Sequence, residues 1–543
     1  MHHTLEVAEI LESIFSHLDP SQDFWGDTAL DLLWSHQTLG NVIRCLPADL
    51  WTLDEVTSPG AIGPHREMRL LRPVVETDWE RPRVYTRRIK SLNFGAPWIG
   101  LYEVFPDISL CFPRDLFPQL QRFEWRVGDC DPSYVPLFAC STLVELSLGH
   151  PIASILSIFA QKCPALRDIA IDALDDLDAP NSNAIEDVST FVGELRSIRS
   201  ITVHSLNWKA LEHLVQIPAL VHLDLIRLPT TLPPILDVVG ICTLQKLRIK
   251  PRAQIRPLTA FFRLFRNAPL ASIDVYSFPA DATVSDTSNL YSALAAGCAH
   301  TFLTELKLDA STPDNRADTD KYIIRGSSIR ILFCFHNLME VYIRSPYGLD
   351  MDADTVDGMA RAWPRIQSLR FTSFTCLVTP LPIHCLLSFA QHCPDLAFLE
   401  MPLDATSIPD AGSPPGLAID VSHRRLYKLY TPHSPIRAPY DVQIFLTALF
   451  PNLLWIETDR TGDDNESDDA IRRYGAEIAQ DALWMEVETG LQASVDWDAI
   501  VSGDVTELPR MPLPRLSSSQ ILSRNMGEFP MALPLPPFPI VST

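Results

Sequence analysis

A short hydrophobic pattern that returns along most of the chain limits its possible folds more than any other feature. In each copy an apolar residue is followed by two variable residues, a second apolar residue, one variable residue and a third apolar residue, as in STLVELSL, IPALVHLDL and TLQKLRI. The first apolar positions of the copies are residues 89, 120, 143, 166, 198, 220, 244, 270, 303, 338, 366, 396, 426 and 453, about 28 residues apart on average. This self-similarity predicts an array of repeated structural units.

The segments between the copies have the pattern of helices. ILSIFAQKCP, LTAFFRLFRNAP, VDGMARAWP and CLLSFAQHCP carry apolar residues at three- and four-residue spacing and end at a proline. Each unit is therefore a helix, a turn and a short strand whose apolar residues face the helix. One unit cannot bury its apolar face alone, so the units should stack into a parallel sheet with right-handed crossovers.

The period and the strand pattern resemble those of the leucine-rich-repeat family, which implies an α/β solenoid of parallel strands and helices. The asparagine that this family carries after each strand pattern is absent, and Pro151, Leu174, Leu228 and Phe278 occupy that place. Without this side-chain ladder we expect an irregular solenoid. A doubly wound α/β fold is the competing architecture, although it does not require fourteen similar strand patterns.

Composition narrows the class of protein further. The chain has 543 residues, of which 46% are hydrophobic, and its formal net charge is −23. An acidic surface repels phosphates, so we expect neither nucleic acid nor a membrane as a partner. The eleven cysteines form no CxxC motif, MHHTLEVAEILESIF lacks the features of a secretory signal, and no apolar run reaches 18 residues. These observations predict a cytoplasmic or nuclear protein with reduced cysteines that is not secreted.

The first fifty residues contain three segments with helical patterns. In LEVAEILESIFSHLDP, Leu5, Ile10, Ile14 and Leu18 form an apolar stripe that ends at Pro20. Together with ALDLLW and IRCLPADLW, this segment resembles the F-box of proteins abundant in mushroom-forming fungi, in which leucine-rich repeats follow the box. The resemblance implies that these five residues dock on a Skp-type adaptor of a cullin–RING ubiquitin ligase and that the repeats hold a protein substrate.

The F-box resemblance is incomplete in its middle. Only SQDFWGDT stands where the family carries a further leucine-rich helix, so the box is shorter than usual. Two interpretations therefore stay open. The segment either docks on the adaptor or forms an amphipathic helical cap over the first strand of the solenoid.

These patterns divide the chain into five parts. Residues 1–54 form the F-box-like helical segment, and residues 55–88, rich in proline, arginine and acid, read as a linker. Residues 89–460 form the irregular solenoid, and residues 461–504 an acidic loop and a capping helix. Residues 505–543 are rich in proline and serine and are expected to be disordered, with a proline-rich ligand as a second interpretation.

No pattern in the sequence proposes catalytic chemistry. GxSxG, HExxH, P-loop and GxGxxG motifs are all absent from the sequence. In HCLLSFAQHC the two ends lie about 12 Å apart on a helix, too far for one zinc ion, so Cys385 and Cys393 are predicted core residues. We therefore expect a non-catalytic protein without catalytic residues, metal site or cofactor.

The variable strand residues should share the open face of the sheet and are the candidate substrate-binding residues. On one strand Lys246, Arg248 and Lys250 make a basic stripe. The C-terminal repeats add the aromatic and arginine side chains that dominate protein interfaces, namely Tyr342, Arg344, Arg370, Phe398, Tyr430 and Trp455. We expect Tyr342, Arg370, Phe398 and Tyr430 to form one row across four repeats. Cover by the C-terminal cap or tail is the alternative.

Two functions fit this sequence. The first is the substrate-recognition subunit of an SCF-type ubiquitin ligase, with a Skp-type adaptor, a cullin and an unknown protein substrate as partners implied by the F-box resemblance. The second is a ligase-independent repeat scaffold for protein–protein interaction. The sequence names neither the substrate nor a modification on it.

Overall fold

The computed structural model describes most of the repeat region and parts of both flanks. The described residues are 23–56, 65–94, 106–112, 116–125, 132–150, 152–171, 182–229, 243–249, 255–278, 283–310, 322–345, 347–373, 379–408, 422–458 and 468–493.

One parallel sheet of fifteen strands runs through the molecule, and its strands follow one another in the order of the chain. The strands are β1 (His36–Thr38), β4 (Ser91–Asn93), β5 (Arg122–Trp125), β6 (Glu145–Leu148), β7 (Asp168–Ile171), β8 (Ser200–Ser205), β9 (His222–Arg227), β10 (Lys246–Ile249), β11 (Ser272–Phe278), β12 (Glu305–Ala310), β14 (Glu340–Ser345), β16 (Ser368–Ser373), β18 (Phe398–Glu400), β20 (Lys428–Tyr430) and β21 (Trp455–Glu457). A doubly wound fold reverses its strand order at a switch point, and this sheet does not. The predicted α/β solenoid is confirmed.

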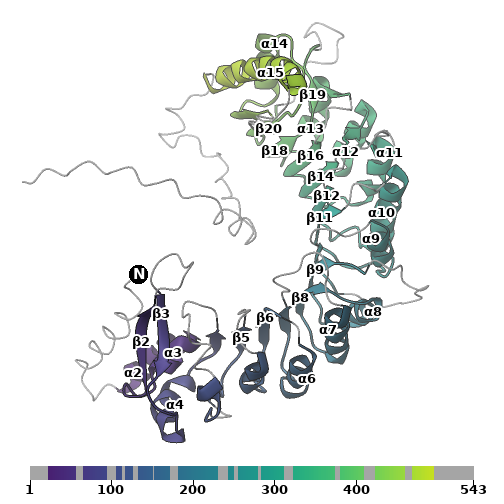
Figure 1. The fold of residues 1–543 in the computed structure, drawn as a ribbon. Coiled ribbons are helices and arrows are strands. Elements are labelled where there is room, and N and C mark those ends of the chain that lie inside the picture. The colour runs from purple at the N-terminus through teal and green to yellow at the C-terminus, as the bar shows by residue number, and fades with distance from the viewer. Residues whose placement is uncertain are drawn as a thin grey trace, which may run out of the picture.

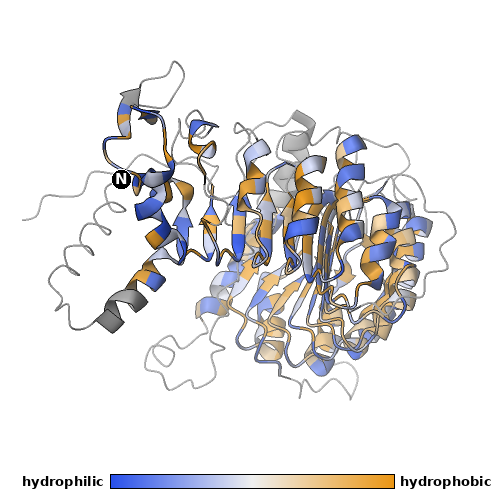
Figure 2. Ribbon diagram, turned by 90° about the horizontal axis from the view of Figure 1, so that it is seen from below, coloured by the Kyte–Doolittle hydropathy of each residue, from blue (hydrophilic) through white to orange (hydrophobic). Residues whose placement is uncertain are grey.

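The helices form a second layer on one side of this sheet. They are α6 (Ala153–Lys162), α7 (Ser182–Glu194), α8 (Trp208–Gln216), α9 (Ile255–Phe262), α10 (Val284–Gly297), α11 (Gly326–Ile329), α12 (Ala353–Ala362), α13 (Leu386–His392) and α14 (Pro439–Leu449), with 3-10 turns η3 (Pro132–Phe138), η5 (Arg330–Cys334) and η6 (Ile383–Cys385). Figure 1 shows an open arc with the strands on its inner side and the helices outside. The helices stand side by side and mix hydrophobic with hydrophilic residues (Figure 2), as helices with one buried face do.

Several helices end in the same way because a proline follows them. The residues Cys163, Trp363, Cys393 and Phe450 each precede a proline, and their backbone angles lie near φ −115 to −130 and ψ 62 to 75. Proline disfavours the helical conformation in the residue before it, so the chain leaves the helix at this position and turns toward the next strand. All four side chains are buried, so the turn is also anchored in the core.

Main-chain groups join each strand to the next in a repeated way. The carbonyl of Lys90 accepts hydrogen bonds from the N–H groups of Gln121 and Arg122, and the carbonyl of Gln121 accepts those of Val144 and Glu145. The same two-donor arrangement recurs from Ser35 at one end of the sheet to Tyr427 at the other. This ladder of backbone carbonyls orders the strands although the family's asparagine is absent.

The middle apolar residue of each strand lies in the core beneath the sheet. Leu92, Phe123, Leu223, Val341 and Leu369 each have an exposed fraction of at most 1%. Burying a side chain of this size stabilises the fold by about 1.5–3 kcal/mol. The alternation that the sequence predicts therefore fixes which side chains are left for the inner face.

The N-terminal region differs from the prediction because the sheet begins before residue 89. Strand β1 pairs with β4, and α3 (Leu39–Arg44) packs beside it, after α2 (Asp23–Trp34). The expected linker also contains regular structure: the antiparallel hairpin of β2 (Trp51–Val56) and β3 (His65–Leu70), then η2 (Glu76–Trp79) and α4 (Glu80–Thr86).

The charged residues of this segment pair with one another, which explains its order. Arg72 donates two hydrogen bonds of 2.8 Å to the buried carboxylate of Asp78 and a third of 2.9 Å to Asp49. The ring of Trp79 is fully buried against Phe112. Residues 55–88 have a composition typical of linkers, but they contain a bidentate arginine–aspartate ion pair and a buried tryptophan that packs in the core.

At the C-terminal end, α15 (Asp468–Ala493) packs against α14 and β21. The buried Trp484 donates from Nε1 to the carbonyl of Ser434 at 2.8 Å. The acidic residues 459–467 and the expected tail lie outside the described residues. Two short parallel pairs, β13 (Ile324–Arg325) with β15 (Leu349–Asp350) and β17 (Leu381–Pro382) with β19 (Leu403–Asp404), connect the loops that follow β12 and β14 and those that follow β16 and β18. Within the described ranges, no helix has the length and apolar character needed to cross a bilayer.

Candidate functional site

Two rows of outward-facing side chains cross the inner face of the arc. The first row holds the residue before each buried middle residue, and the second row holds the residue after it. From β8 to β21 the first row is Ser200, His222, Lys246, Ser272, Glu305, Glu340, Ser368, Phe398, Lys428 and Trp455. The second row is Thr202, Asp224, Arg248, Asp274, Lys307, Tyr342, Arg370, Glu400, Tyr430 and Glu457.

The expected single row of four aromatic and arginine residues is wrong at one position. Tyr342 and Arg370 are direct partners in the second row, but the next member of that row is Glu400, and Tyr430 follows it. Phe398 belongs to the first row. The reason is that Phe398 precedes its buried Leu399, whereas Arg370 follows its buried Leu369.

Four of these side chains and Arg344, two residues beyond Tyr342 on β14, nevertheless stack on one another across four strands, and we call these five residues the concave ladder. Its order is Arg344, Tyr342, Arg370, Phe398 and Lys428. The Arg370 guanidinium carbon lies 5.0 Å from the centre of the Tyr342 ring and 5.2 Å from that of Phe398. Arg344 lies 5.8 Å from Tyr342, and the Lys428 ammonium lies 5.5 Å from Phe398. Cations and aromatic rings therefore alternate within cation–π distance.

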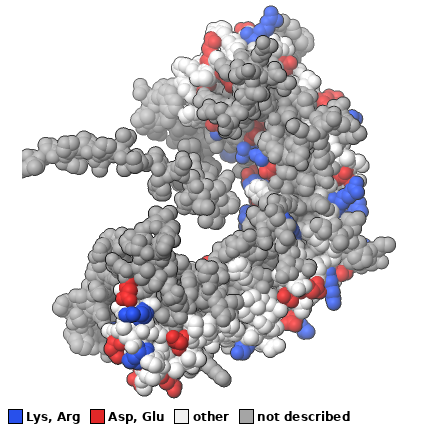
Figure 3. Space-filling view, in the orientation of Figure 1, with Lys and Arg blue, Asp and Glu red and all other residues white. Residues whose placement is uncertain are grey.

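Each cation of the concave ladder also has a carboxylate partner. Arg370 Nε donates to Glu400 Oε2 at 2.7 Å, and the Glu400 side chain is 1% exposed. Lys428 lies 2.7 Å from Glu457, and Arg344 lies 3.4 Å from Asp309. Figure 3 shows basic and acidic side chains together on the inner side of the arc. The concave ladder is thus rigid and close to neutral.

The substrate-binding residues predicted from the sequence include neither Lys428 nor the three carboxylates that pair with the cations. The signal for Glu400 was present, because placing equivalent repeat positions side by side puts it next to Arg370. Residue type alone selected the aromatic and arginine side chains and passed over the acids that hold them.

The last predicted residues lie beside the concave ladder. Trp455 is the first-row neighbour of Lys428 and is 48% exposed. Tyr430 is half-buried in the second row. The C-terminal helix therefore leaves about half of the Trp455 side chain exposed, and the tail, the other part of the cover alternative, lies outside the described residues.

Lys246 and Arg248 lie on a separate part of the inner face. Strands β11 and β12 stand between them and β14, about 14 Å in total. Arg248 Nε donates to Asp274 at 3.2 Å, and burial raises the pKa of Asp274 to about 6. Lys250 lies outside the described residues. The basic stripe is therefore partly neutralised and distinct from the concave ladder.

Lys307 joins these two regions. It pairs with Glu305 at 2.6 Å and with Glu340 at 3.0 Å. Burial alone would lower the pKa of Lys307, but the hydrogen bond to Glu305 and the charge of Glu340 outweigh burial and raise it to about 12. The lysine is therefore charged across the physiological pH range.

The predicted adaptor-binding residues, Leu5, Ile10, Ile14, Leu18 and Pro20, lie outside the described residues. The other two F-box-like segments are described. ALDLLW lies in α2, where Trp34 stacks on Tyr85 with ring centres 4.6 Å apart, and IRCLPADLW runs from α3 to Trp51 with Ile43, Leu46 and Leu50 buried.

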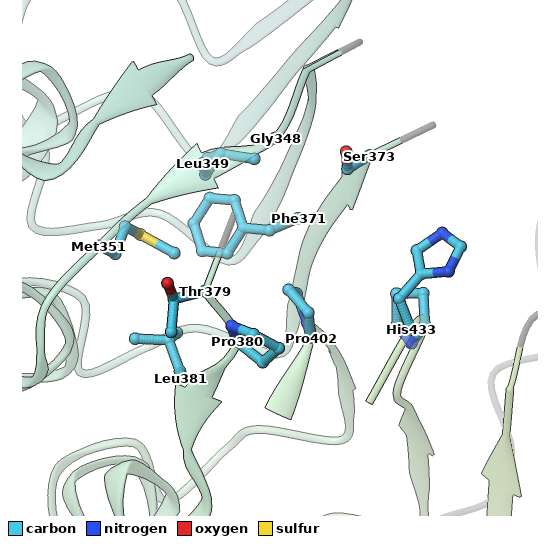
Figure 4. A pocket seen from close by; sticks show the side chains of 11 residues that line it. Gly348, Leu349, Met351, Phe371, Ser373, Thr379, Pro380, Leu381, Pro402 and His433 are labelled. Carbon is cyan, nitrogen blue, oxygen red and sulfur yellow. The ribbon is translucent and has the colours of Figure 1, made fainter. Parts of the chain in front are cut away.

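A small pocket opens at the carboxyl end of β16. It is lined mainly by apolar residues, among them Leu349, Met351, Phe371 and Leu381 (Figure 4), and its volume is about 30 Å³, room for roughly one water molecule. Ser373 on its rim follows Arg370 by three residues, about 10 Å along the strand.

Cys385 and Cys393, predicted as core residues, are buried. No group of three metal-binding side chains occurs in the described part of the chain.

No protein-family model matches the chain, and no curated protein matches its sequence. Among solved structures the chain is similar to one in the crystal structure of the Rad7 and Elc1 complex in yeast, at 15% sequence identity. The match covers 87% of this chain and 95% of that chain, with a TM-score of 0.36.

Proposed function

We propose that this chain is the non-catalytic substrate-recognition subunit of a cullin–RING ubiquitin ligase. Its N-terminal residues up to Pro20 dock on a Skp-type adaptor, and the inner face of the solenoid holds a protein substrate. The apolar stripe of Leu5, Ile10, Ile14 and Leu18 supports the adaptor half of the proposal. The concave ladder supports the substrate half.

The concave ladder is the observation that carries the proposal. It places two aromatic rings and two arginines on adjacent strands of an open, curved sheet, and these side-chain types dominate the binding energy of protein interfaces. The carboxylates of Asp309 and Glu400 pair with the two arginines and hold them in place, so little conformational entropy is lost when a partner binds.

A repeat scaffold without a ligase is the second candidate function, and one observation favours it. The second and third F-box-like segments are part of the repeat array, since β1 pairs with β4 and α3 packs against β1. These two segments therefore contribute to the repeat array instead of forming a separate helical box with the first segment.

Deletion of residues 1–22 tests the adaptor half. The described sheet and helices lie within residues 23–493, and the melting temperature of the truncated protein shows whether they stay folded. Co-expressed with a Skp-type adaptor and a cullin, the full chain should retain both through purification and the truncated chain neither. If the full chain never retains adaptor under conditions in which an intact F-box protein does, the scaffold function replaces the ligase function.

The substrate half has an independent test. Arg370→Glu combined with Tyr430→Ala should weaken partner binding by at least ~2 kcal/mol, the threshold of an interface hot spot. Charge reversal places a second carboxylate beside the buried Glu400 and should itself destabilise the fold, so the melting temperature must be measured in parallel. Binding that is unchanged in a folded variant would place the partner elsewhere on the chain.

A further inference from the structure

Arg370 is held by its neighbours in one orientation. Its Nε donates to the buried Glu400, and the guanidinium lies between the rings of Tyr342 and Phe398. A guanidinium has five N–H donors in a fixed plane. Within the described residues, the Arg370 side chain donates a hydrogen bond to Glu400 from Nε. The four N–H donors of Nη1 and Nη2 face no acceptor among the described residues.

The Arg370 side chain is 43% exposed, although its carboxylate partner is almost fully buried. The bonded edge of the guanidinium therefore points into the sheet face, and its other edge is left for solvent or a partner. Two parallel N–H donors on that edge match the two oxygens of a carboxylate.

We propose that the outer edge of Arg370 receives a side-chain carboxylate of the protein partner, from an aspartate or glutamate whose neighbouring apolar residues contact Tyr342 and Phe398. This inference rests on the proposed function, because it takes the concave face as the protein-binding surface. It adds the chemistry by which the partner is chosen.

The charges of the concave ladder favour a carboxylate over a phosphate. Its three cations are balanced by Asp309, Glu400 and Glu457, each within 3.4 Å or less of its partner. A nearly neutral site gives little long-range attraction to a dianion. It selects instead by the geometry of a bidentate hydrogen bond in a partly dehydrated setting.

Arg248 provides a matched control within the same molecule. It also stands in the second row, and its Nε also donates to an acid on the next strand, Asp274. Its neighbours in the positions of Tyr342 and Phe398 are Asp224 and Ser272, so neither of those two positions carries an aromatic ring. If replacing any inner-face arginine weakens binding, replacement of Arg248 and of Arg370 should have similar effects. If Arg370 recognises the partner specifically, only its replacement should weaken binding.

The experiment uses the full chain and a phage-displayed library of random dodecapeptides. Selected peptides should carry an acidic residue next to apolar residues, and changing that residue to its amide should weaken binding about tenfold or more. Arg370→Lys, which keeps the charge beside Glu400 but loses the planar fork, should weaken binding by a similar factor, whereas Arg248→Lys should leave it within about twofold. The peptide change requires no change in the protein, so it reads recognition even if Arg370→Lys is unstable.

The other outcomes each overturn a stated part. Peptides that lose binding to Trp455→Ala but contain no essential acid would overturn the carboxylate inference and leave the concave face as a protein-binding surface. A selected peptide that binds more tightly when phosphoserine replaces its acid would show that a phosphate is the preferred ligand. If no peptide binds and the partner-binding test on Arg370 and Tyr430 also shows no loss, both the inference and the substrate half of the proposed function fail.

Discussion

Arg248 and Arg370 occupy equivalent places in the centre and in the C-terminal part of one sheet, and their surroundings differ. Each lies in the second row and donates from Nε to a buried acid on the following strand, at 3.2 Å for Arg248 and 2.7 Å for Arg370. Arg370 is sandwiched between aromatic rings, whereas Arg248 has an acid and a serine in those positions.

The repeat thus supplies the same backbone position and the same acid contact twice, and the neighbours decide what the arginine does. In the centre the arginine compensates buried acids, including Asp274 with its raised pKa. In the C-terminal part the aromatic rings fix the cation in a defined orientation and leave one edge open. Preorganisation rather than charge distinguishes the candidate binding region.

The largest expected effect is one that should not distinguish the two regions. Leu247→Ala and Leu369→Ala each remove a fully buried side chain beneath the corresponding arginine, and each should lower the free energy of unfolding by roughly 2–5 kcal/mol. Chemical denaturation of both variants measures this. A loss at one position much larger than at the other would mean that the cores differ, and the comparison of the arginines would need that correction.

The second prediction concerns pH. Burial raises the pKa of Asp274 from 3.8 to about 6, so between these values the folded chain holds a proton that the unfolded chain has released. The stability contributed by this group is therefore greatest below pH 4 and falls as pH rises through about 6. Asp274→Asn removes this dependence. The free energy of unfolding of this variant, relative to that of the wild type, should therefore increase between pH 3.8 and about 6, by at most about 3 kcal/mol.

Urea denaturation at a series of pH values checks that difference. Asp395→Asn, at an acid in an exposed pair with Arg425, is the control. If the difference in free energy of unfolding between Asp274→Asn and the wild type is the same at all pH values, the pair of Arg248 and Asp274 is better solvated than its burial indicates.

The third prediction converts the C-terminal arrangement toward the central one. Phe398→Ser removes a ring that contacts both Arg370 and Lys428, and it should destabilise the fold by about 1–2 kcal/mol, the sum of two cation–π contacts. Phe398→Tyr, which keeps the ring, should cost much less. Peptide binding should fall with Phe398→Ser more than its stability loss explains, and an unchanged affinity would argue against orientation of Arg370 by the rings.

The smallest expected change in stability is at Trp455. Because the side chain is 48% exposed, Trp455→Ala should alter the free energy of unfolding by no more than about 0.5 kcal/mol. If the partner reaches the end of the sheet, affinity should fall although stability does not. A clear loss of melting temperature would indicate that the indole is packed more firmly than its exposure suggests.

The period and alternation of the sequence predicted the parallel strands, the outer helices and the outward-facing positions, because burial of Leu223 or Leu369 requires that arrangement. They did not predict β1, whose three residues, His36–Thr38, carry no leucine pattern. They also misread residues 55–88, since Arg72 and Asp78 look solvated in sequence and pair only in the fold.

Within the candidate site, residue type identified Arg370 and Tyr342, but not the acid that orients Arg370. Glu400 looks like a surface residue until the strand register places it under Arg370, where its side chain is 1% exposed. The placement of Phe398 failed for a related reason, because one residue along a strand changes the row and therefore the partner. Pairwise contacts across repeats are the information that a single repeat pattern does not contain.

The carbonyl ladder that joins the strands has a consequence for how such a protein can change over generations. Successive repeats are attached through backbone N–H and carbonyl groups, which every amino acid except proline supplies, so other mutations in the two outward rows leave the attachment intact. Selection can therefore alter the inner surface one residue at a time while spacing and curvature stay the same. The same independence makes the array a suitable framework for engineered binders, in which the outward residues are varied and the leucines and the prolines after the helices are kept.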